Sequence, residues 1–154
     1  MFLGHFRHNL DAKGRVAVPA QFRRGLPEGS VVAHGPEGRL VIRPPDEWAA
    51  LERNHRLTAE SPLMERSYFR LLYSSARPLE LDAQGRMLID AEHRRWAEIT
   101  DRAVFVGLGA CVEVIGEALW DAEVAGIDQA AFTALHDAVL ARSASGPASP
   151  TPTA

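Results

Sequence analysis

The chain has 154 residues, of which 46% are apolar and 24% charged, and it carries a net charge of −3 and one cysteine. This composition suits one compact domain, or two small halves that share a core, and it excludes a disulfide framework. No apolar run is long enough to span a membrane and no signal-peptide pattern opens the chain, so we expect a cytoplasmic protein.

The first part of the chain predicts short strands joined by tight turns. Strands are expected at 2–10, 15–18, 30–34 and 39–43, with turns at 11–15 and 36–38 and a short helix at 19–24. A pair of prolines ends the fourth strand. Asp46 is the expected N-cap of a helix that contains Trp48, Leu51 and Leu57.

A connecting helix should follow. Ser61 is its expected N-cap and Pro62 its first residue. Residues at helical spacing predict its buried face, namely Met64, Tyr68, Leu71, Leu72 and Ser75.

The second part of the chain predicts a similar series of elements. Strands are expected at 79–82 and 87–89, then a helix from its cap Asp90 to Ala97, a hairpin of 103–108 with 111–115, and helices at 117–125 and 129–142. Each half therefore has the order β-β-α-β-β-α, which predicts an α+β fold, and neither half is large enough to make a core alone.

Five segments follow from this order. They are a first half at 1–60, a connecting helix at 61–76, a second half at 77–125, a C-terminal helix at 126–142 and a tail at 143–154. The tail has no bulky apolar residue and is rich in Ser, Pro, Ala and Thr, so we expect it to be disordered.

One five-residue motif occurs twice. DAKGR occupies residues 11–15 and DAQGR occupies residues 82–86, and in both copies an apolar run and then a pair of arginines follow. Such a repeat indicates a duplicated module. Two copies are too few for a solenoid, so we expect two halves that pack against each other.

The motif has the chemistry of a tight turn. The carboxylates of Asp11 and Asp82 can accept a backbone N–H two residues further on, and Gly14 and Gly85 can adopt positive φ without steric cost. Because apolar runs flank both motifs, each copy predicts a β-hairpin.

Two interpretations of the arginine in each motif remain open. Arg15 and Arg86 emerge near the aspartate that opens their turn, so each Asp–Arg pair could serve only to hold the turn together. Alternatively, each hairpin presents an exposed arginine to a ligand. The two interpretations are compatible if the aspartate orients the arginine.

Charge is unevenly distributed. Residues 1–24 contain five basic residues against the single acidic Asp11, whereas residues 113–137 contain six acidic residues and no Lys or Arg. The basic hairpin suits DNA, because a two-stranded ribbon fits the major groove and arginine can contact guanine O6 and N7. Arg23 and Arg24 could contact phosphates. The alternative is a solvated basic surface that binds nothing charged.

No residue pattern makes a positive case for catalysis, a cofactor or a metal. His5 and His8 lie three apart on a predicted strand and point to opposite faces, so joint metal ligation is not expected. Cys111 lies in an apolar strand, as buried inert cysteines do. Neither a dinucleotide-binding nor a Walker motif is present.

Specific residues resemble the MraZ family of bacterial transcriptional regulators. The pattern is MFxG at 1–4, NLDxKGRxxxPxxFR at 9–23 and the second DxxGR at 82–86, and the resemblance covers residues 1–140. It implies a duplicated fold similar to AbrB-type domains, in which hairpins interleave into a small β-barrel with peripheral helices. It also implies a ring-shaped homo-oligomer, associated with the nucleoid, that binds short G-rich direct repeats in double-stranded DNA. These repeats lie in the promoter of the division-and-cell-wall gene cluster, which usually begins with the regulator's own gene.

The resemblance transfers DNA contact to Arg15, with Arg86 as its counterpart. The full set of expected DNA-binding residues is Arg15, Arg86, Lys13, Arg7, Arg23 and Arg24, with Asp11, Gly14, Asp82 and Gly85 organising the turns. The copies differ at Lys13 and Gln84, and the second has acidic neighbours, so the halves need not contact DNA equally. No membrane or small-molecule partner is expected. A pure oligomerisation module, an AbrB-like antitoxin that binds a toxin through its acidic C-terminal helices, and an enzyme are the alternatives.

Overall fold

The computed structural model describes residues 1–144. The chain divides into two compact units, residues 1–120 and residues 121–154. Of the predicted tail at 143–154, Ser143 and Ala144 form the end of the last helix, and 145–154 lie outside the described residues.

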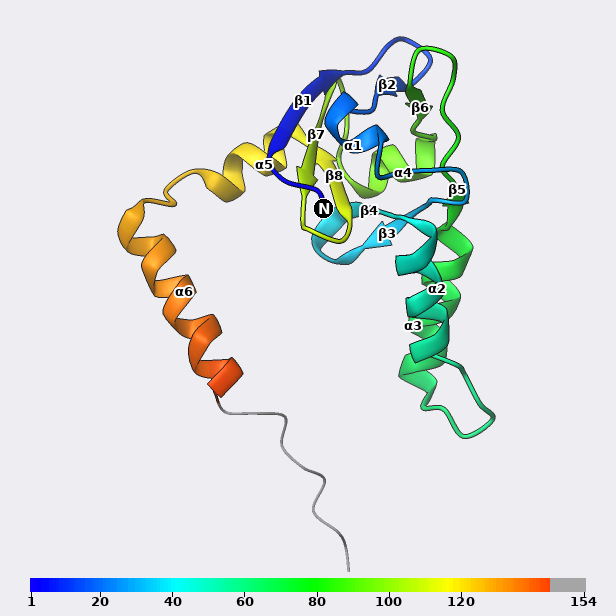
Figure 1. The fold of residues 1–154 in the computed structure, drawn as a ribbon, viewed down its shortest axis with the longest axis vertical. Coiled ribbons are helices and arrows are strands. Elements are labelled where there is room, and N and C mark those ends of the chain that lie inside the picture. Colours follow the sequence, from blue (N-terminus) through cyan, green and yellow to red (C-terminus); the bar gives the residue numbers. More distant parts are fainter. Residues whose placement is uncertain (145–154) are drawn as a thin grey trace, which may run out of the picture. The chain divides into compact units, whose positions relative to one another are not determined.

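Short strands alternate with helices along the chain (Figure 1). The elements are β1 (His5–Asn9), β2 (Arg15–Ala17), α1 (Ala20–Arg23), β3 (Val31–Gly35), the 3-10 turn η1 (Pro36–Gly38), β4 (Arg39–Arg43), α2 (Pro45–Asn54), α3 (Leu63–Ser75), β5 (Arg77–Pro78), β6 (Arg86–Leu88), α4 (Ala91–Trp96), β7 (Arg102–Gly107), β8 (Val112–Gly116), α5 (Glu117–Val124) and α6 (Gln129–Ala144). No helix within residues 1–144 is long and apolar enough to cross a membrane.

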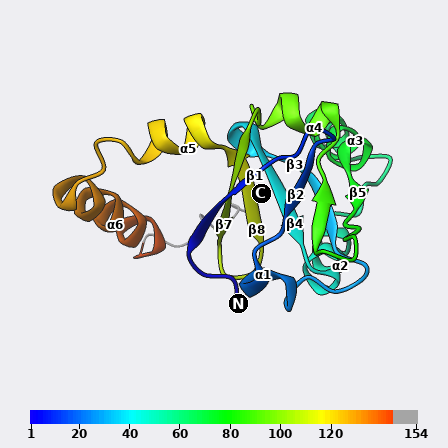
Figure 2. The same ribbon diagram turned by 90° about the horizontal axis from the view of Figure 1, so that it is seen from above.

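Within residues 1–144 the strands form two antiparallel sheets. The larger has six strands in the order β1-β7-β8-β4-β3-β5 (Figure 2), and the smaller pairs β2 with β6 (Figure 1). This is the expected mixed α+β fold. The pairings within residues 1–144 leave β1 and β5 at the two edges of the larger sheet and do not describe a closed barrel.

The prediction that the two strands flanking each motif pair with each other is wrong. The turns form as expected, but β1 pairs with β7 and β2 pairs with β6, so each motif's strands pair with strands of the other copy. Between β1 and β2 there is a single bridge, Leu10 to Val16. Three-residue strands are too short to make a stable hairpin alone. Pairing across the copies buries Val16 and Met87 almost completely.

One hydrophobic core serves both copies. It contains Val16, Val18 and Phe22 after the first motif, and Met87 and Ile89 after the second. Strands of the larger sheet complete it with Leu40, Ile42, Phe105, Val112 and Val114. Residues that follow both motifs therefore pack into a single cluster.

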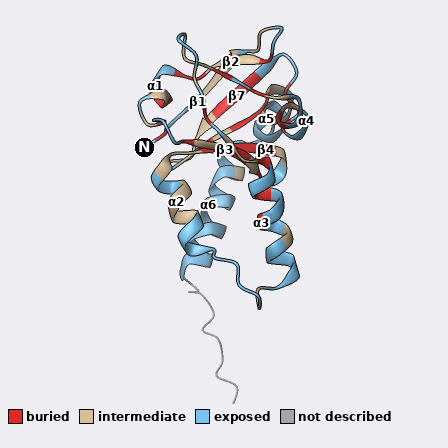
Figure 3. Ribbon diagram, turned by 90° about the vertical axis from the view of Figure 1, so that its right-hand side faces the viewer, coloured by how far each residue is buried: buried red, intermediate tan, exposed pale blue. Residues whose placement is uncertain are grey.

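Helices α2 and α3 pack against each other on β3 and β4. Trp48 and Leu51 of α2 contact a small cluster formed by Phe69 and Leu72 of α3 with Ala33 of β3. Figure 3 shows that most of the remaining surface of the two helices is exposed.

Both N-cap predictions for this helical pair are wrong, and α2 ends at Asn54, so Leu57 lies beyond the helix that was expected to contain it. Pro44 and Pro62 occupy the N-cap positions, without side-chain capping, where Asp46 and Ser61 were expected. Ser61 instead accepts a hydrogen bond from the Thr58 N–H at 2.9 Å.

The predicted buried face of α3 is partly wrong. Leu72 and Ser75 are buried as expected, together with Phe69. Met64, Tyr68 and Leu71 are 54–78% exposed. Two overlapping apolar stripes satisfy the helical spacing, and the packing of α3 on β3 and α2 selects the stripe through Phe69.

The second half follows the prediction closely, with one exception. Asp90 caps α4 by accepting the His93 N–H at 2.8 Å, and β7 pairs with β8 as the expected hairpin. The strand expected at 79–82 is absent from the described residues, and a two-residue edge strand, β5, lies just before it at Arg77–Pro78. Leu79 instead donates one backbone hydrogen bond to Ser30.

Candidate nucleic-acid interface

The first motif is a turn held by one carboxylate. Asp11 Oδ1 accepts the backbone N–H groups of Lys13 and Arg15, both at 2.9 Å, and Asp11 Oδ2 accepts Arg15 Nε at 2.7 Å. Gly14 has φ 81°, a left-handed conformation that glycine adopts without steric cost. The carboxylate therefore fixes both the backbone of the turn and the direction of the arginine.

The second motif repeats this geometry almost atom for atom. Asp82 Oδ1 accepts the backbone N–H groups of Gln84 and Arg86 at 2.9 Å, and Asp82 Oδ2 accepts Arg86 Nε at 2.8 Å. Gly85 has φ 74°. Identical hydrogen bonds in both copies show that the DxxGR motif itself encodes the turn.

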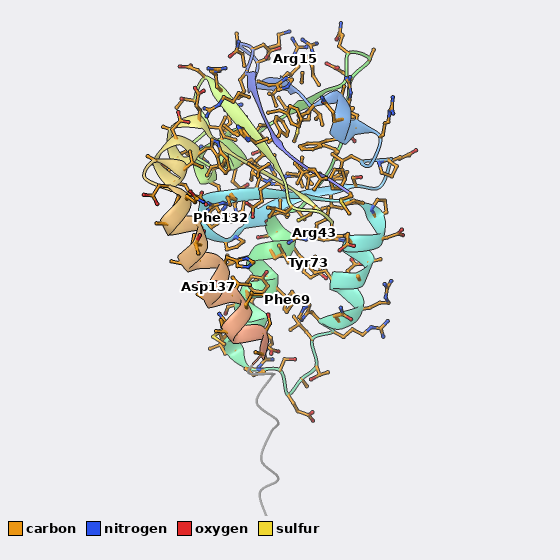
Figure 4. The ribbon with its side chains drawn as sticks, turned by 60° about the vertical axis from the view of Figure 1, so that its left-hand side comes forward. Arg15, Arg43, Phe69, Tyr73, Phe132 and Asp137 are labelled. Carbon is orange, nitrogen blue, oxygen red and sulfur yellow. The ribbon has the colours of Figure 1, made fainter. Side chains whose placement is uncertain are left out.

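The two turns lie side by side on one ribbon. β2 pairs with β6 so that Arg15 is opposite Leu88 and Arg86 is opposite Ala17. Arg86 Nη1 also lies 3.5 Å from Asp11 Oδ2, which links the second motif to the first. Figure 4 places Arg15 at the end of residues 1–120 that lies away from Phe69 and Tyr73 of α3.

Both interpretations of the motif arginines fit this geometry. Each arginine is ion-paired with its own aspartate, yet the Arg15 side chain is 35% exposed and that of Arg86 is 28% exposed. The aspartates thus orient the arginines and leave part of each guanidinium accessible.

The hydrogen bonds of the turns favour ionised aspartates. The Arg15 backbone N–H, with the Arg15 side chain and the Lys13 N–H, lowers the pKa of Asp11 below its usual 3.8. The Arg86 backbone N–H, with the corresponding groups, lowers the pKa of Asp82 in the same way. Both aspartates therefore stay ionised to lower pH than an unperturbed aspartate does.

The other predicted DNA-binding residues fall into two groups. Lys13 and Arg24 are exposed, Lys13 in the first turn and Arg24 just after α1. Arg23 directs Nη1 to the Gln84 carbonyl oxygen at 3.3 Å. Arg7 is part-buried in β1 and donates to Glu117 at 2.8 Å, so this basic residue is paired with the acidic part of the chain.

Two acidic neighbours of the second motif, Asp90 and Glu92, are also paired. Arg77 lies 3.6 Å from the Asp90 carboxylate and 3.2 Å from that of Glu92. The second turn therefore meets less uncompensated negative charge than its sequence suggests.

Arg94 is the first of the two arginines that follow the second motif. Its Nη1 donates to the Ile89 carbonyl at 2.6 Å, and its guanidinium lies against Gly14. Aligning the two motifs matches Arg94 with Arg23 of the first copy, but the alignment does not reveal the contact with Gly14.

The residues considered for other chemistry lie apart from the turns. The ring of His5 packs on Trp120 and that of His8 on Phe105. Burial raises the pKa of the Cys111 thiol, which favours the unreactive protonated form. Residues 1–144 contain no group of three or more His, Cys, Asp or Glu that is arranged to hold a metal ion.

This combination defines a class of protein: a duplicated α+β domain that presents paired arginines on a two-stranded ribbon. Comparison with known proteins gives the family. The chain matches the family described as "MraZ protein, putative antitoxin-like" over residues 1–67 and 72–142.

Curated relatives carry the same designation. The chain is 39% identical over 120 residues to "Transcriptional regulator MraZ" of Desulfitobacterium hafniense, a match that covers 78% of this chain and 84% of the relative. The identity is 36% over 121 residues with the protein of that name from Desulforamulus reducens (79% and 85% coverage) and 37% over 123 residues with that from Herpetosiphon aurantiacus (80% and 82%). The chain belongs to the MraZ family of transcriptional regulators, which are DNA-binding proteins and not enzymes.

Proposed function

We propose that this protein is a sequence-specific DNA-binding regulator, acting as a repressor, and that Arg15 and Arg86 read the bases. The observation that carries the proposal is the pair of aspartate-anchored arginines on the β2–β6 ribbon. A two-stranded ribbon is narrow enough to enter the major groove of B-DNA.

The orientation of Arg15 supports base contact. Asp11 engages Nε, and within residues 1–144 neither terminal nitrogen of Arg15 has a protein partner. Those two nitrogens are the ones that can donate together to O6 and N7 of guanine. Guanine-rich operators are therefore the expected targets.

Backbone contacts would come from the exposed basic residues beside the ribbon. Lys13 and Arg24 are suited to phosphates, which fix the position and orientation of a protein on the duplex. Arg7 is the weakest candidate of the predicted set, because its guanidinium is part-buried against Glu117.

A single chain offers a small contact, so we also propose a ring-shaped homo-oligomer. Large apolar side chains are exposed on α3 and, separately, on α6, and they could be covered by neighbouring copies. They are Leu63, Met64, Tyr68 and Leu71 on α3 and Phe132, Leu135, Val139 and Leu140 on α6. Several ribbons on one particle make the later DNA contacts intramolecular, which raises avidity by roughly 10²–10⁴.

The proposed targets are short G-rich direct repeats upstream of the division-and-cell-wall gene cluster and of the regulator's own gene, bound by a cytoplasmic, nucleoid-associated protein. An AbrB-like interleaving of the two copies is the proposed framework, and the exchange of strand partners between the motifs supports it.

The test is a mobility-shift assay on the DNA immediately upstream of the gene. The assay is repeated on two altered DNAs, in which about half a helical turn or about a full turn is inserted between two repeats. We expect salt-dependent binding that the half-turn insertion weakens far more than the full turn. Light scattering of the same sample measures the oligomer.

Three outcomes would contradict parts of this proposal. An oligomer that shifts no DNA at low salt would indicate a pure interaction module. A small toxin that copurifies with the chain would favour the antitoxin alternative. Binding that is insensitive to repeat spacing would rule out the multivalent mechanism.

A further inference from the structure

Each turn of the ribbon is contacted by an arginine from the helix that follows the other motif. A methyl group placed on Gly14 would overlap the Arg94 guanidinium, and one placed on Gly85 would overlap that of Arg23. The contacts are reciprocal, since Arg23 follows the first motif and Arg94 follows the second. Positive φ favours glycine in each turn, and any side chain placed there would also displace this arginine.

Arg94 is bonded into the framework that supports the first turn. It donates to the Ile89 carbonyl at 2.6 Å, and the Ile89 N–H donates to the Gly14 carbonyl at 2.9 Å. Gly14 is buried beneath this guanidinium and immediately precedes Arg15. A shift of Arg94 would therefore move the backbone from which Arg15 extends.

Arg23 has the matching place at the second turn. Its Nη1 lies 3.3 Å from the Gln84 carbonyl, and the Val18 N–H donates to the Gly85 carbonyl at 3.0 Å. Gly85 is half-buried and immediately precedes Arg86. The Arg23 bond is longer and more exposed than that of Arg94, so we expect the weaker effect here.

We propose that Arg94 and Arg23 are positioning residues: Arg94 holds the first turn so that Arg15 faces the DNA, and Arg23 does the same for the second turn and Arg86. The effect is crossed, because each copy positions the arginine of the other. The inference rests on the proposed function for its consequence in DNA binding, but its structural part can be tested without DNA.

The first experiment measures hydrogen exchange of the Gly14 and Gly85 amides in the free, full-length protein. These N–H groups donate to the Asp11 carbonyl at 3.0 Å and the Asp82 carbonyl at 2.9 Å. In Arg94→Ala the protection of Gly14 should fall roughly tenfold, the factor expected for one lost hydrogen bond, while Gly85 is unchanged. Arg23→Ala should show the reverse pattern with a smaller change.

The neighbouring arginines provide matched controls. Arg95 and Arg24 are exposed, and neither lies over a turn glycine. Replacing Arg95 or Arg24 with alanine removes the same positive charge as replacing its neighbour Arg94 or Arg23. Arg95→Ala and Arg24→Ala should leave both amides as protected as in the parent protein. Equal loss of protection in these controls, or no loss in Arg94→Ala, would overturn the proposal.

The second experiment separates positioning from direct phosphate contact. Arg94→Ala should weaken DNA binding roughly tenfold with an unchanged salt dependence, whereas removal of a phosphate contact lowers the slope of log K against log salt by about 0.9. In an Arg15→Ala background the Arg94→Ala substitution should have no further effect, because the group it positions is gone.

A reduced salt slope or full additivity with Arg15→Ala would overturn the positioning role and indicate direct contact. Should Arg94→Ala fail to fold, Arg94→Lys retains a donor near Ile89 and should keep part of both the Gly14 protection and the DNA affinity. An Arg94→Lys protein that folds and binds DNA like the parent, although its Gly14 amide has lost protection, would also count against it. If no variant, including the parent, binds DNA, the proposed function fails while the exchange data still decide the positioning.

Discussion

The two copies of the motif have the same backbone geometry, but their arginines differ in their hydrogen-bond and ion-pair partners. In both, one carboxylate accepts two N–H groups at 2.9 Å and the arginine Nε at 2.7–2.8 Å. At the second copy, Arg86 Nη2 also donates to Gln84 Oε1 at 2.9 Å and Nη1 approaches Asp11 at 3.5 Å. At the first copy, residues 1–144 contain no ion pair from Arg15 to Asp82.

The difference has a simple chemical source. Gln84 has a side-chain oxygen that accepts the Arg86 guanidinium, whereas Lys13, at the matching position, has only donors and carries its own positive charge. Within residues 1–144, Arg15 therefore keeps two terminal nitrogens without a protein partner, beside an exposed lysine. In the proposed complex, Arg15 can contact a base without losing a protein contact, whereas Arg86 would have to exchange protein contacts for DNA contacts.

The largest expected effect is a loss of DNA affinity when Arg15 or Arg86 is replaced with alanine. Arg15→Ala should abolish specific binding, since one bidentate base contact is worth about 1–3 kcal/mol and the loss recurs in every subunit of an oligomer. Arg86→Ala should cost less, because Arg86 gives up bonds to Gln84 and Asp11 when it binds. Mobility shifts on operator DNA measure both.

Circular dichroism melts of the same proteins provide the control. Both variants should fold, because surface ion pairs of this exposure contribute little to stability. An unfolded Arg15→Ala protein would mean that the Asp11–Arg15 pair is structural, and a larger loss for Arg86→Ala would reverse the comparison.

The stability cost of replacing the turn glycine should also be larger at the first copy than at the second. Gly14→Ala and Gly85→Ala each force a side chain into the left-handed region, which costs about 1–2 kcal/mol of unfolding free energy. Gly14 is the more buried and lies against the shorter Arg94 bond, so its substitution should cost more. Chemical denaturation gives the two values, and equal costs would argue against distinct support of the two turns.

Exchanging the residues that differ should exchange the behaviour of the copies. Gln84→Lys removes the acceptor of Arg86 and adds a positive charge, so affinity should rise and the salt slope should steepen by about 0.9 if the lysine reaches a phosphate. Lys13→Gln should do the opposite at the first copy. Salt titrations of DNA binding test both substitutions, and two variants that respond alike would show that this position does not distinguish the copies.

The smallest effect should be on stability in acid. The pKa values of Asp11 and Asp82 are lowered on folding, chiefly by the backbone N–H groups of Arg15 and Arg86. Their contribution is therefore fully present above the ordinary aspartate pKa of 3.8 and is lost as the pH falls through the lower folded-state values.

Thermal melts across this acid range measure that loss. Asp11→Asn should flatten the acid side of the profile more than Asp82→Asn, because Asp11 also lies near Arg86. A steeper loss for the Asp11→Asn protein than for the parent would contradict the assignment.

Local features of this protein follow from the sequence alone. The turns, the Asp90 cap and the β7–β8 hairpin depend on hydrogen bonds between residues close in the chain, so their side-chain chemistry predicts them. The family resemblance rests on the same short patterns. The candidate base-reading residues, Arg15 and Arg86, were also predicted from these patterns, and their role in DNA binding stays a prediction.

Tertiary structure decided what depends on contacts between distant residues. Strand pairing across the copies, the burial of Phe69 in place of Tyr68, and the position of Arg94 over Gly14 all join segments far apart in the chain. Helical or strand periodicity offers several equivalent faces and partners, and the packing of the whole core selects among them. For that reason the turns could be predicted residue by residue, while the residues that support them could not.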